Sequence, residues 1–309
     1  MPLHPQARSY LDRMAALGNP PHHLAAVADS RRLMEDLTPA LAGPAERVEC
    51  DETHRIDGPA GKIRVRRWGP SAEESTATIV YFHGGGWVVG SPETHEVLCR
   101  ALANRCNAQV IAPAYRRAPE HHYPAALDDA EAVVRWVADD APRTGQSRIV
   151  VAGDSAGANL AAALTIRFRD AGTPRLSGQI LLYPMLDHAC RTPSFTECAA
   201  GYGLAAETAR WYWDQYLADA SVGDRPTASP LRSADLSGLP SAVVVTCEYD
   251  PLRSEGDEYA CRLAAAGVAT TNWQEAGMIH GFLRLPGTFT RAAVSLDRIA
   301  ASMSAWVKN

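Results

Sequence analysis

The sequence predicts an α/β fold in which helices cover both faces of a mostly parallel sheet. From residue 78 onward, short apolar runs of strand length alternate with longer helix-like segments. The runs at the centre are continuously apolar, which is typical of strands buried on both faces. A glycine-rich turn at 153–157 joins one such run directly to an alanine-rich helix. With 309 residues, 46% of them hydrophobic, the chain can form one large domain with an inserted segment.

The segments before this alternation have different patterns. Apolar side chains recur at helical spacing through 3–41, with an Asn-Pro-Pro break at 19–21, so this region is expected to be helical. Apolar and polar residues alternate through 47–56 and 62–68, which predicts a hairpin of partly exposed strands. The later predicted strands are 78–82, 109–114, 148–152, 179–183, 241–247 and 270–274, and the later helices are 93–104, 124–139, a segment from 158, 259–266 and 289–307.

The alternation stops between 188 and 230, where no clear strand is found and a helix is expected at 207–218. An insertion at the carboxyl end of a strand lies where open α/β sheets bind ligands. We therefore expect a single domain, 1–309, in which a helical cap covers the core. The cap is expected to comprise 1–45 and 188–230, and the core 46–187 and 231–309.

The predicted cap helix is rich in aromatic residues. Trp211, Trp213 and Tyr216 could line an apolar pocket for a ligand, or they could pack within the cap. The sequence leaves both interpretations open.

Charge and composition exclude several classes of function. The formal net charge is −5 and no basic stripe is present, which argues against binding to nucleic acid or an anionic membrane. No signal peptide or membrane-spanning run is evident. The seven cysteines are scattered without a Cys-x-x-Cys pair, so a reducing, cytoplasmic location is expected. The pair His22 and His23 has no third ligand nearby, and no metal site is predicted.

The turn at 153–157 reads Gly-Asp-Ser-Ala-Gly. A serine on a tight turn between a strand and a helix has a strained backbone and a side chain exposed at the edge of the sheet, and the flanking glycines let strand and helix pass closely. Ser155 is therefore the candidate nucleophile, with Asp154 as part of the supporting motif. An ordinary glycine-rich turn is the alternative.

A serine hydroxyl needs a base to take its proton and a carboxylate to orient that base. His280 is the candidate base, because it follows the last predicted strand and only one other histidine lies downstream of Ser155. Asp250 is the candidate acid, because Pro251 indicates that the preceding strand has ended. Glu248 is expected on or near that strand as a supporting acid, and Asp257 is expected in the next helix as a solvated charge.

The run His-Gly-Gly-Gly-Trp at 83–87 directly follows a predicted central strand. Glycines let the backbone approach a substrate oxygen and direct N–H groups toward it, as an oxyanion site requires. The N–H of Ala156, after the nucleophile, is expected to be a further donor. Gly84 supports this loop, and His83 is expected to hold it by hydrogen bonding. No Gly-Lys-Ser/Thr follows, so the run is not a phosphate loop.

These motifs together resemble the hormone-sensitive-lipase-like family (family IV) of bacterial carboxylesterases, in the α/β-hydrolase superfamily. The resemblance implies an eight-stranded α/β-hydrolase sheet with a two-part helical cap, and it assigns the oxyanion N–H groups to Gly85, Gly86 and Ala156. Members often dimerise through a sheet edge, so a homodimer is an expectation. The family more often has leucine where this chain has Arg117. The matching stretches are 83–87, 115–121, 123–129, 153–157, 250–253 with Gly256, and 280–282.

The sequence thus predicts a serine esterase that acts through an acyl-enzyme, with a small-molecule ester as its partner and no cofactor. The resemblance implies that its substrates are carboxylic esters with short- to medium-length acyl chains. An amidase, formamidase or lactonase would use the same machinery. Plant gibberellin receptors share the fold but lack the catalytic histidine, so the presence of Ser155, Asp250 and His280 argues against a receptor for small molecules.

Overall fold

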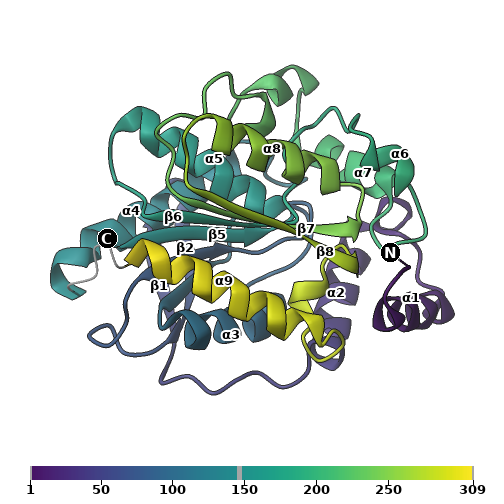
Figure 1. Ribbon diagram of the computed structural model, residues 1–309, viewed down its shortest axis with the longest axis horizontal. Helices are drawn as coiled ribbons and strands as arrows, with labels where there is room; N and C mark the ends of the chain where they lie inside the picture. The colour runs from purple at the N-terminus through teal and green to yellow at the C-terminus, as the bar shows by residue number, and fades with distance from the viewer. Residues whose placement is uncertain (1, 145–147, 308–309) are drawn as a thin grey trace.

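The computed structural model describes residues 2–144 and 148–307 and contains an eight-stranded sheet (Figure 1). Its strand order is β1-β2-β4-β3-β5-β6-β7-β8. The β1–β2 and β2–β4 pairs are antiparallel and the other pairs are parallel, which confirms the predicted mostly parallel sheet. The strands are β1 (Cys50–Gly58), β2 (Gly61–Gly69), β3 (Thr78–Phe82), β4 (Gln109–Pro113), β5 (Ile149–Asp154), β6 (Gly178–Leu182), β7 (Ala242–Tyr249) and β8 (Thr270–Ile279).

Helices lie on both faces of this sheet (Figure 1). One face is covered by α4, α5 and α8, and the other by α3 and α9. The α-helices are α1 (Pro5–Leu17), α2 (Val27–Ala42), α3 (Glu96–Cys106), α4 (Ala125–Thr144), α5 (Ala156–Ala171), α6 (Ser194–Glu197), α7 (Ala206–Tyr216), α8 (Arg253–Ala265) and α9 (Arg291–Val307), and the 3₁₀ turns are η1 (His22–Leu24), η2 (Glu93–His95), η3 (Ala220–Asp224), η4 (Pro230–Arg232) and η5 (Phe282–Arg284).

The hydrophobic core is divided by the sheet into two clusters. Alternate residues of a strand point to opposite faces, so Val80 and Phe82 of β3 join one cluster while Ile79 and Tyr81 join the other. All five residues of β3 are buried. Both faces of the central strands are therefore covered, as their continuously apolar sequences predict.

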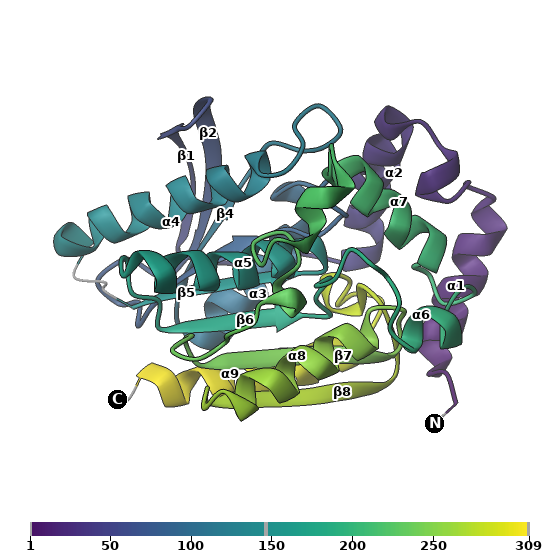
Figure 2. The same cartoon turned by 90° about the horizontal axis from the view of Figure 1, so that it is seen from above.

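The N-terminal helices and the insertion after β6 gather at the carboxyl end of the parallel strands (Figure 2). His23 of η1 and Thr208 of α7 are hydrogen-bonded, with 2.8 Å between Nδ1 and Oγ1. Arg31 of α2 donates to the carbonyl oxygen of Val88 at 2.8 Å and forms an ion pair with Glu120. The two segments expected to form a cap thus contact each other over one end of the sheet.

Some element boundaries differ from those predicted. β8 extends to Ile279 instead of 274, passing through Gly277 in a positive-φ conformation, and α8 begins at Arg253 instead of 259. The additional part of β8 follows a register shift against β7, which apolar periodicity does not reveal. The elements themselves are present as expected, including the hairpin of β1 and β2.

The turn between β5 and α5 depends on the absence of side chains at its two glycines. A Cβ on Gly157 would lie 1.9 Å from the carbonyl oxygen of Phe82 on β3, and a Cβ on Gly153 would lie 2.4 Å from the backbone of Gly157. Only glycine allows α5 to start this close to the neighbouring strand. The chain direction at Ser155 is therefore set by contact between two backbones.

We expect Gly157→Ala to lower the Tm by at least about 4 °C, because the methyl group must displace the backbone of β3. Thermal unfolding followed by circular dichroism measures this. Gly172→Ala, at the other end of α5, is the matched control, since a Cβ there meets nothing within 4 Å and only positive-φ strain remains. Equal shifts for the two variants would contradict the packing argument.

Candidate active site

Ser155 occupies the turn between β5 and α5 with φ 56° and ψ −121°. Positive φ is rare for a residue other than glycine and stores backbone strain, which clusters at functional sites. Three backbone hydrogen bonds hold this conformation. The Ser155 N–H donates to the carbonyl oxygen of Leu182 at 2.9 Å, and the carbonyl oxygen of Ser155 accepts the N–H groups of Asn159 at 3.1 Å and Met185 at 3.3 Å. The predicted tight turn is therefore present, with the hydroxyl beside a cavity.

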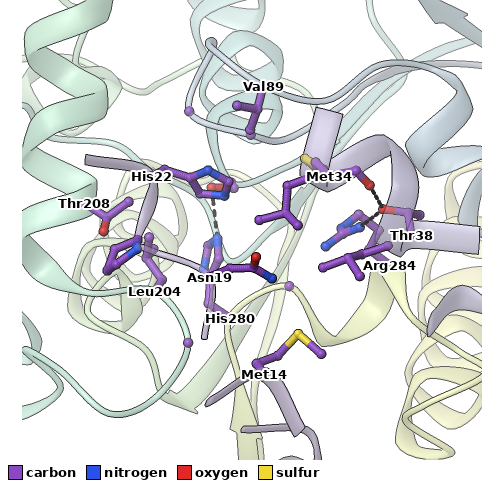
Figure 3. A pocket seen from close by; sticks show the side chains of 18 of the residues that line it. Met14, Asn19, His22, Met34, Thr38, Val89, Leu204, Thr208, His280 and Arg284 are labelled. Carbon is purple, nitrogen blue, oxygen red and sulfur yellow. Dashed lines mark hydrogen bonds between the residues drawn. The ribbon is translucent and has the colours of Figure 1, made fainter. Parts of the chain in front are cut away.

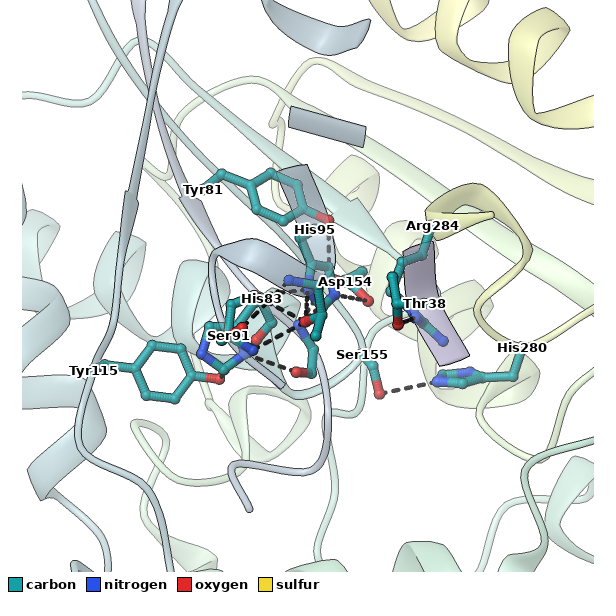
Figure 4. A network of polar contacts seen from close by, with 12 residues as sticks. Thr38, Tyr81, His83, Ser91, His95, Tyr115, Asp154, Ser155, His280 and Arg284 are labelled. Atoms are coloured by element: carbon teal, nitrogen blue, oxygen red, sulfur yellow. Dashed lines mark hydrogen bonds and ion pairs between the residues drawn. The ribbon is translucent and has the colours of Figure 1, made fainter. Parts of the chain in front are cut away.

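His280 directly follows β8, and its Nε2 lies 3.0 Å from the Ser155 hydroxyl (Figure 4). Asp250 directly follows β7, the strand next to β8. Its Oδ2 lies 2.7 Å from His280 Nδ1, and its Oδ1 accepts the N–H of Leu252 at 2.9 Å. The carboxylate is completely buried. The three candidate residues thus form one continuous hydrogen-bonded chain.

The other two acids near this strand lie elsewhere. Glu248 is the last but one residue of β7 and accepts the N–H of Gly277 at 2.7 Å, so it supports the end of β8. Sequence reasoning treats Asp257 as a solvated charge in the next helix. That prediction is wrong, because Asp257 is partly buried in α8 and accepts the hydroxyl of Thr246 at 2.8 Å.

The loop after β3 brings backbone N–H groups toward Ser155. Gly85 and Gly86 have φ values of 113° and 59°, which glycine adopts without strain. In the part of the chain that the structure describes, no hydrogen bond uses the N–H of either glycine. Ala156 is the first residue of α5, where an N–H has no acceptor within the helix. Three unpaired donors therefore lie on the segments that border the hydroxyl.

Asp154 connects this loop to the serine turn (Figure 4). Its Oδ1 accepts the hydroxyl of Tyr81 at 2.8 Å and the N–H of Gly84 at 2.9 Å, and lies 3.2 Å from Nε2 of His95. Burial favours the neutral acid, but the charge of His95 and the hydrogen bonds from His95 and Tyr81 outweigh it and hold the pKa of Asp154 below its ordinary value. A Cβ on Gly84 would lie 2.4 Å from this carboxylate.

His83 holds the same loop from its other side. Its ring stacks on Tyr115 with centroids 4.2 Å apart, and its Nδ1 lies 2.8 Å from the carbonyl oxygen of Gly84. Complete burial, and then the neighbouring charge of His95, lower the pKa of His83 to about 3. The imidazole is therefore neutral at physiological pH, which suits a packing and hydrogen-bonding role.

The side chains of two cap segments enclose a cavity of about 320 Å³ above Ser155 (Figure 3). Tyr212 of α7 lies over the glycine loop after β3, since a Cβ on Gly86 would overlap its ring. Trp213 and Tyr216 instead pack against Trp87, with ring centroids 4.5 Å and 4.0 Å away. The cavity is lined by residues of α1, α2, η1 and α7 together with the site, among them Tyr10, Leu11, Met14, His22, Leu33, Met34, Leu37, Leu41, Leu204, Tyr212 and Arg284.

Of the two interpretations of the cap aromatics, packing is the one the structure supports. Trp211, Trp213 and Tyr216 do not line the cavity, whereas Tyr212 does. Sequence reasoning also missed Tyr81 and His95, which hold Asp154. No sequence signal distinguishes these residues from others of their elements, because their roles depend on how distant segments pack.

Residues 2–144 and 148–307 contain no group of three or more side chains suited to hold a metal ion. In the same residues, no helix has both the length and the apolar character needed to cross a membrane. All seven cysteines are free thiols.

The pKa of His83 gives stability a pH dependence. As the pH falls from about 6.5 toward about 3, the unfolded chain binds a proton at this residue and the folded chain does not, so the free energy of unfolding decreases. The loss approaches ~1.4 kcal/mol per pH unit within that window. Urea unfolding at pH 7.0 and 5.5 measures it, and His83→Gln is expected to lose about 1 kcal/mol less than the wild type. Equal losses would contradict a buried, neutral His83.

Known proteins are similar to this chain along most of its length. Residues 79–284 match a family model described as alpha/beta hydrolase fold. The carboxylesterase NlhH of Mycobacterium tuberculosis is 39% identical over 278 residues, covering 88% of this chain and 86% of that protein. The ethyl acetate hydrolase of Pseudomonas putida is 33% identical, covering 98% of this chain and 99% of that protein.

Solved structures are similar along nearly the whole chain. A hyperthermophilic esterase from the archaeon Pyrobaculum calidifontis superposes with a TM-score of 0.93 at 39% identity, covering 99% of this chain and 100% of its own. The chain therefore belongs to the hormone-sensitive-lipase-like esterases of the α/β-hydrolase superfamily, and it is a carboxylic ester hydrolase.

Proposed function

We propose that this esterase hydrolyses short- to medium-chain carboxylic esters through an acyl-enzyme formed on Ser155. The observation that carries the proposal is the chain of two short hydrogen bonds from Asp250 through His280 to the Ser155 hydroxyl, 2.7 Å and 3.0 Å long. This is the arrangement by which a carboxylate orients an imidazole and the imidazole activates a hydroxyl.

In the acylation step, the Ser155 oxygen attacks the ester carbonyl as its proton moves to Nε2 of His280. The new imidazolium is stabilised by Asp250, which is buried and bonded to Nδ1. When the tetrahedral intermediate collapses, the carbon–oxygen bond to the alcohol breaks and His280 returns the proton to the departing oxygen. Water then attacks the acyl-enzyme by the same route and releases the acid.

The negative oxygen of the intermediate needs preorganised donors, and removing one typically costs about 3–4 kcal/mol. The unpaired N–H groups of Gly85, Gly86 and Ala156 border the hydroxyl and meet this need. Asp154, the residue before the nucleophile, accepts the N–H of Gly84 and so holds the loop of these donors beside Ser155.

The size of the cavity supports small substrates. At about 320 Å³ it is at the lower end of the range for small-molecule pockets, about 300–1,000 Å³. Its walls are mainly apolar, with Leu33, Met34 and Leu37 on α2. These features favour a short to medium acyl chain over a long one.

We expect Ser155→Ala to lower kcat on p-nitrophenyl butyrate by at least about 10⁴-fold, and Asp250→Asn by about 10³–10⁴-fold. Glu248→Gln is the matched control, because this acid lies on the same strand end but contacts Gly277 and not His280. A large loss in Glu248→Gln with little loss in Asp250→Asn would overturn the assignment of the acid. Substantial activity in Ser155→Ala would overturn the mechanism.

A series of p-nitrophenyl esters from acetate to laurate tests the substrate size. We expect kcat/KM to be highest between butyrate and octanoate and to fall toward laurate, because a longer chain exceeds the cavity. Matched anilides, measured in parallel, test whether amides are also cleaved. A protein that binds these compounds without turning them over would favour a receptor.

A further inference from the structure

The cavity above Ser155 contains a guanidinium group, Arg284, on the turn η5 that follows His280. Figure 3 shows its side chain directed into the cavity beside Thr38 of α2. One of its nitrogens, Nη1, donates to the Thr38 hydroxyl at 2.7 Å. Within the described ranges 2–144 and 148–307, no other hydrogen bond and no ion pair uses this side chain. A guanidinium has five N–H donors, so most of the Arg284 donors have no partner in the protein.

The Arg284 charge lowers the pKa of Asp154, but within residues 2–144 and 148–307 no hydrogen bond or ion pair joins it to a carboxylate. Asp154 is the one carboxylate among its described lining residues, and its oxygens are engaged by Tyr81, Gly84 and His95. The nearby walls are apolar side chains from α1 and α2. These apolar lining residues are Leu11, Met14, Leu33, Met34, Leu37 and Leu41.

The positive charge acts across the whole cavity. Burial and then the Arg284 charge lower the pKa of His22 on η1. The same charge opposes the rise that burial causes in the pKa of Tyr10 on α1 and Tyr212 on α7. Three different walls therefore face one cation, and none of them supplies a counter-charge.

A merely structural role explains little of this arrangement. To join η5 to α2, Arg284 needs one donor for Thr38, which an uncharged side chain of similar length also has. A partly desolvated charge is costly unless it is paired. The guanidinium of Arg284 is planar, has unpaired N–H donors and faces the proposed substrate cavity. Such a group is suited to bind a carboxylate through two parallel hydrogen bonds.

We propose that Arg284 binds a carboxylate carried by the substrate, so that the preferred esters bear an anionic group in addition to the ester bond. This inference rests on the proposed esterase function and narrows its substrate class. The second carboxylate makes and breaks no bond; it anchors the substrate while Ser155 and His280 act on the ester. Half-esters of dicarboxylic acids carry this group on the acyl side, and esters of hydroxy acids carry it on the alcohol side.

Matched pairs of substrates test the proposal on both sides of the ester bond. Monoethyl adipate and its primary amide, ethyl 5-carbamoylpentanoate, test the acyl side. The acetate ester of 4-hydroxybutanoate and the corresponding amide test the alcohol side. Each pair differs in charge but hardly in size. We expect the acid-to-amide ratio of kcat/KM to be about tenfold or more in one pair, mainly through KM, and to decrease with added salt.

Variants assign this preference to one residue. Arg284→Gln keeps a donor for Thr38 but removes the charge. We expect the acid-to-amide ratio of kcat/KM in this variant to be about one or below. Arg284→Lys keeps the positive charge but lacks the planar guanidinium with its parallel N–H donors. We expect it to retain part of the preference for the acid over the amide. Arg13→Gln is the matched control, because it removes an exposed cation from α1, the helix that lines the cavity through Tyr10, Leu11 and Met14. Circular dichroism and Tm establish that each variant is folded.

The outcomes separate the two proposals. A wild-type ratio near one in both pairs, together with turnover of the neutral amides, overturns the anion site and leaves the esterase function intact. A preference that survives in Arg284→Gln, or that Arg13→Gln removes equally, also overturns it. If Arg284→Gln does not fold, the salt dependence in the wild type and the ratio in Arg284→Lys decide the question. Absence of turnover for these esters and for p-nitrophenyl butyrate counts against the proposed function itself.

Discussion

The buried carboxylate of Asp154 is the interaction on which the geometry of the site depends. It lies next to Ser155 in the chain, and it accepts the N–H of Gly84 on a loop that begins 70 residues earlier. A buried charge is tolerated only when donors surround it, and Tyr81 and His95 supply the remaining ones. One side chain therefore fixes the distance between Ser155 and the glycine loop, which we propose to be the nucleophile and the oxyanion site. The glycine at 84 is required because any side chain there would occupy the space of the carboxylate.

Sequence reasoning identified the elements and the chemistry well where short motifs coincide with sheet topology. Ser155, Asp250 and His280 each follow a parallel strand, and strands of one sheet bring their carboxyl ends to one edge. The proline after Asp250 correctly indicated that β7 ends before this residue, and β7 ends at Tyr249. The assignment of oxyanion donors rested on the family resemblance, because glycine spacing alone does not define which N–H groups face a ligand.

Which aromatic residue of the cap helix α7 faces the cavity is harder to predict from sequence, for a physical reason. Successive helical residues are about 100° apart around the axis, so one of Trp211, Tyr212 and Trp213 can face the site while its neighbours face the core. Hydrophobicity does not distinguish among three aromatic residues, and the structure shows that Tyr212 is the one that lines the cavity. Arg284 was overlooked because a charged residue near a motif is usually solvated. Its position depends on Thr38, which comes from the opposite end of the chain and accepts its hydrogen bond.

The N-terminal region is part of the binding site, and this affects how the protein should be handled. Residues of α1 and α2 form a wall of the cavity, and the N–H of His4 donates to Gly277, three residues before His280, at 3.0 Å. The C-terminal helix α9 ends at the other end of the sheet (Figure 2). An affinity tag fused to the N-terminus would be attached next to a helix that lines the cavity, so purification and immobilisation are better carried out through the C-terminus.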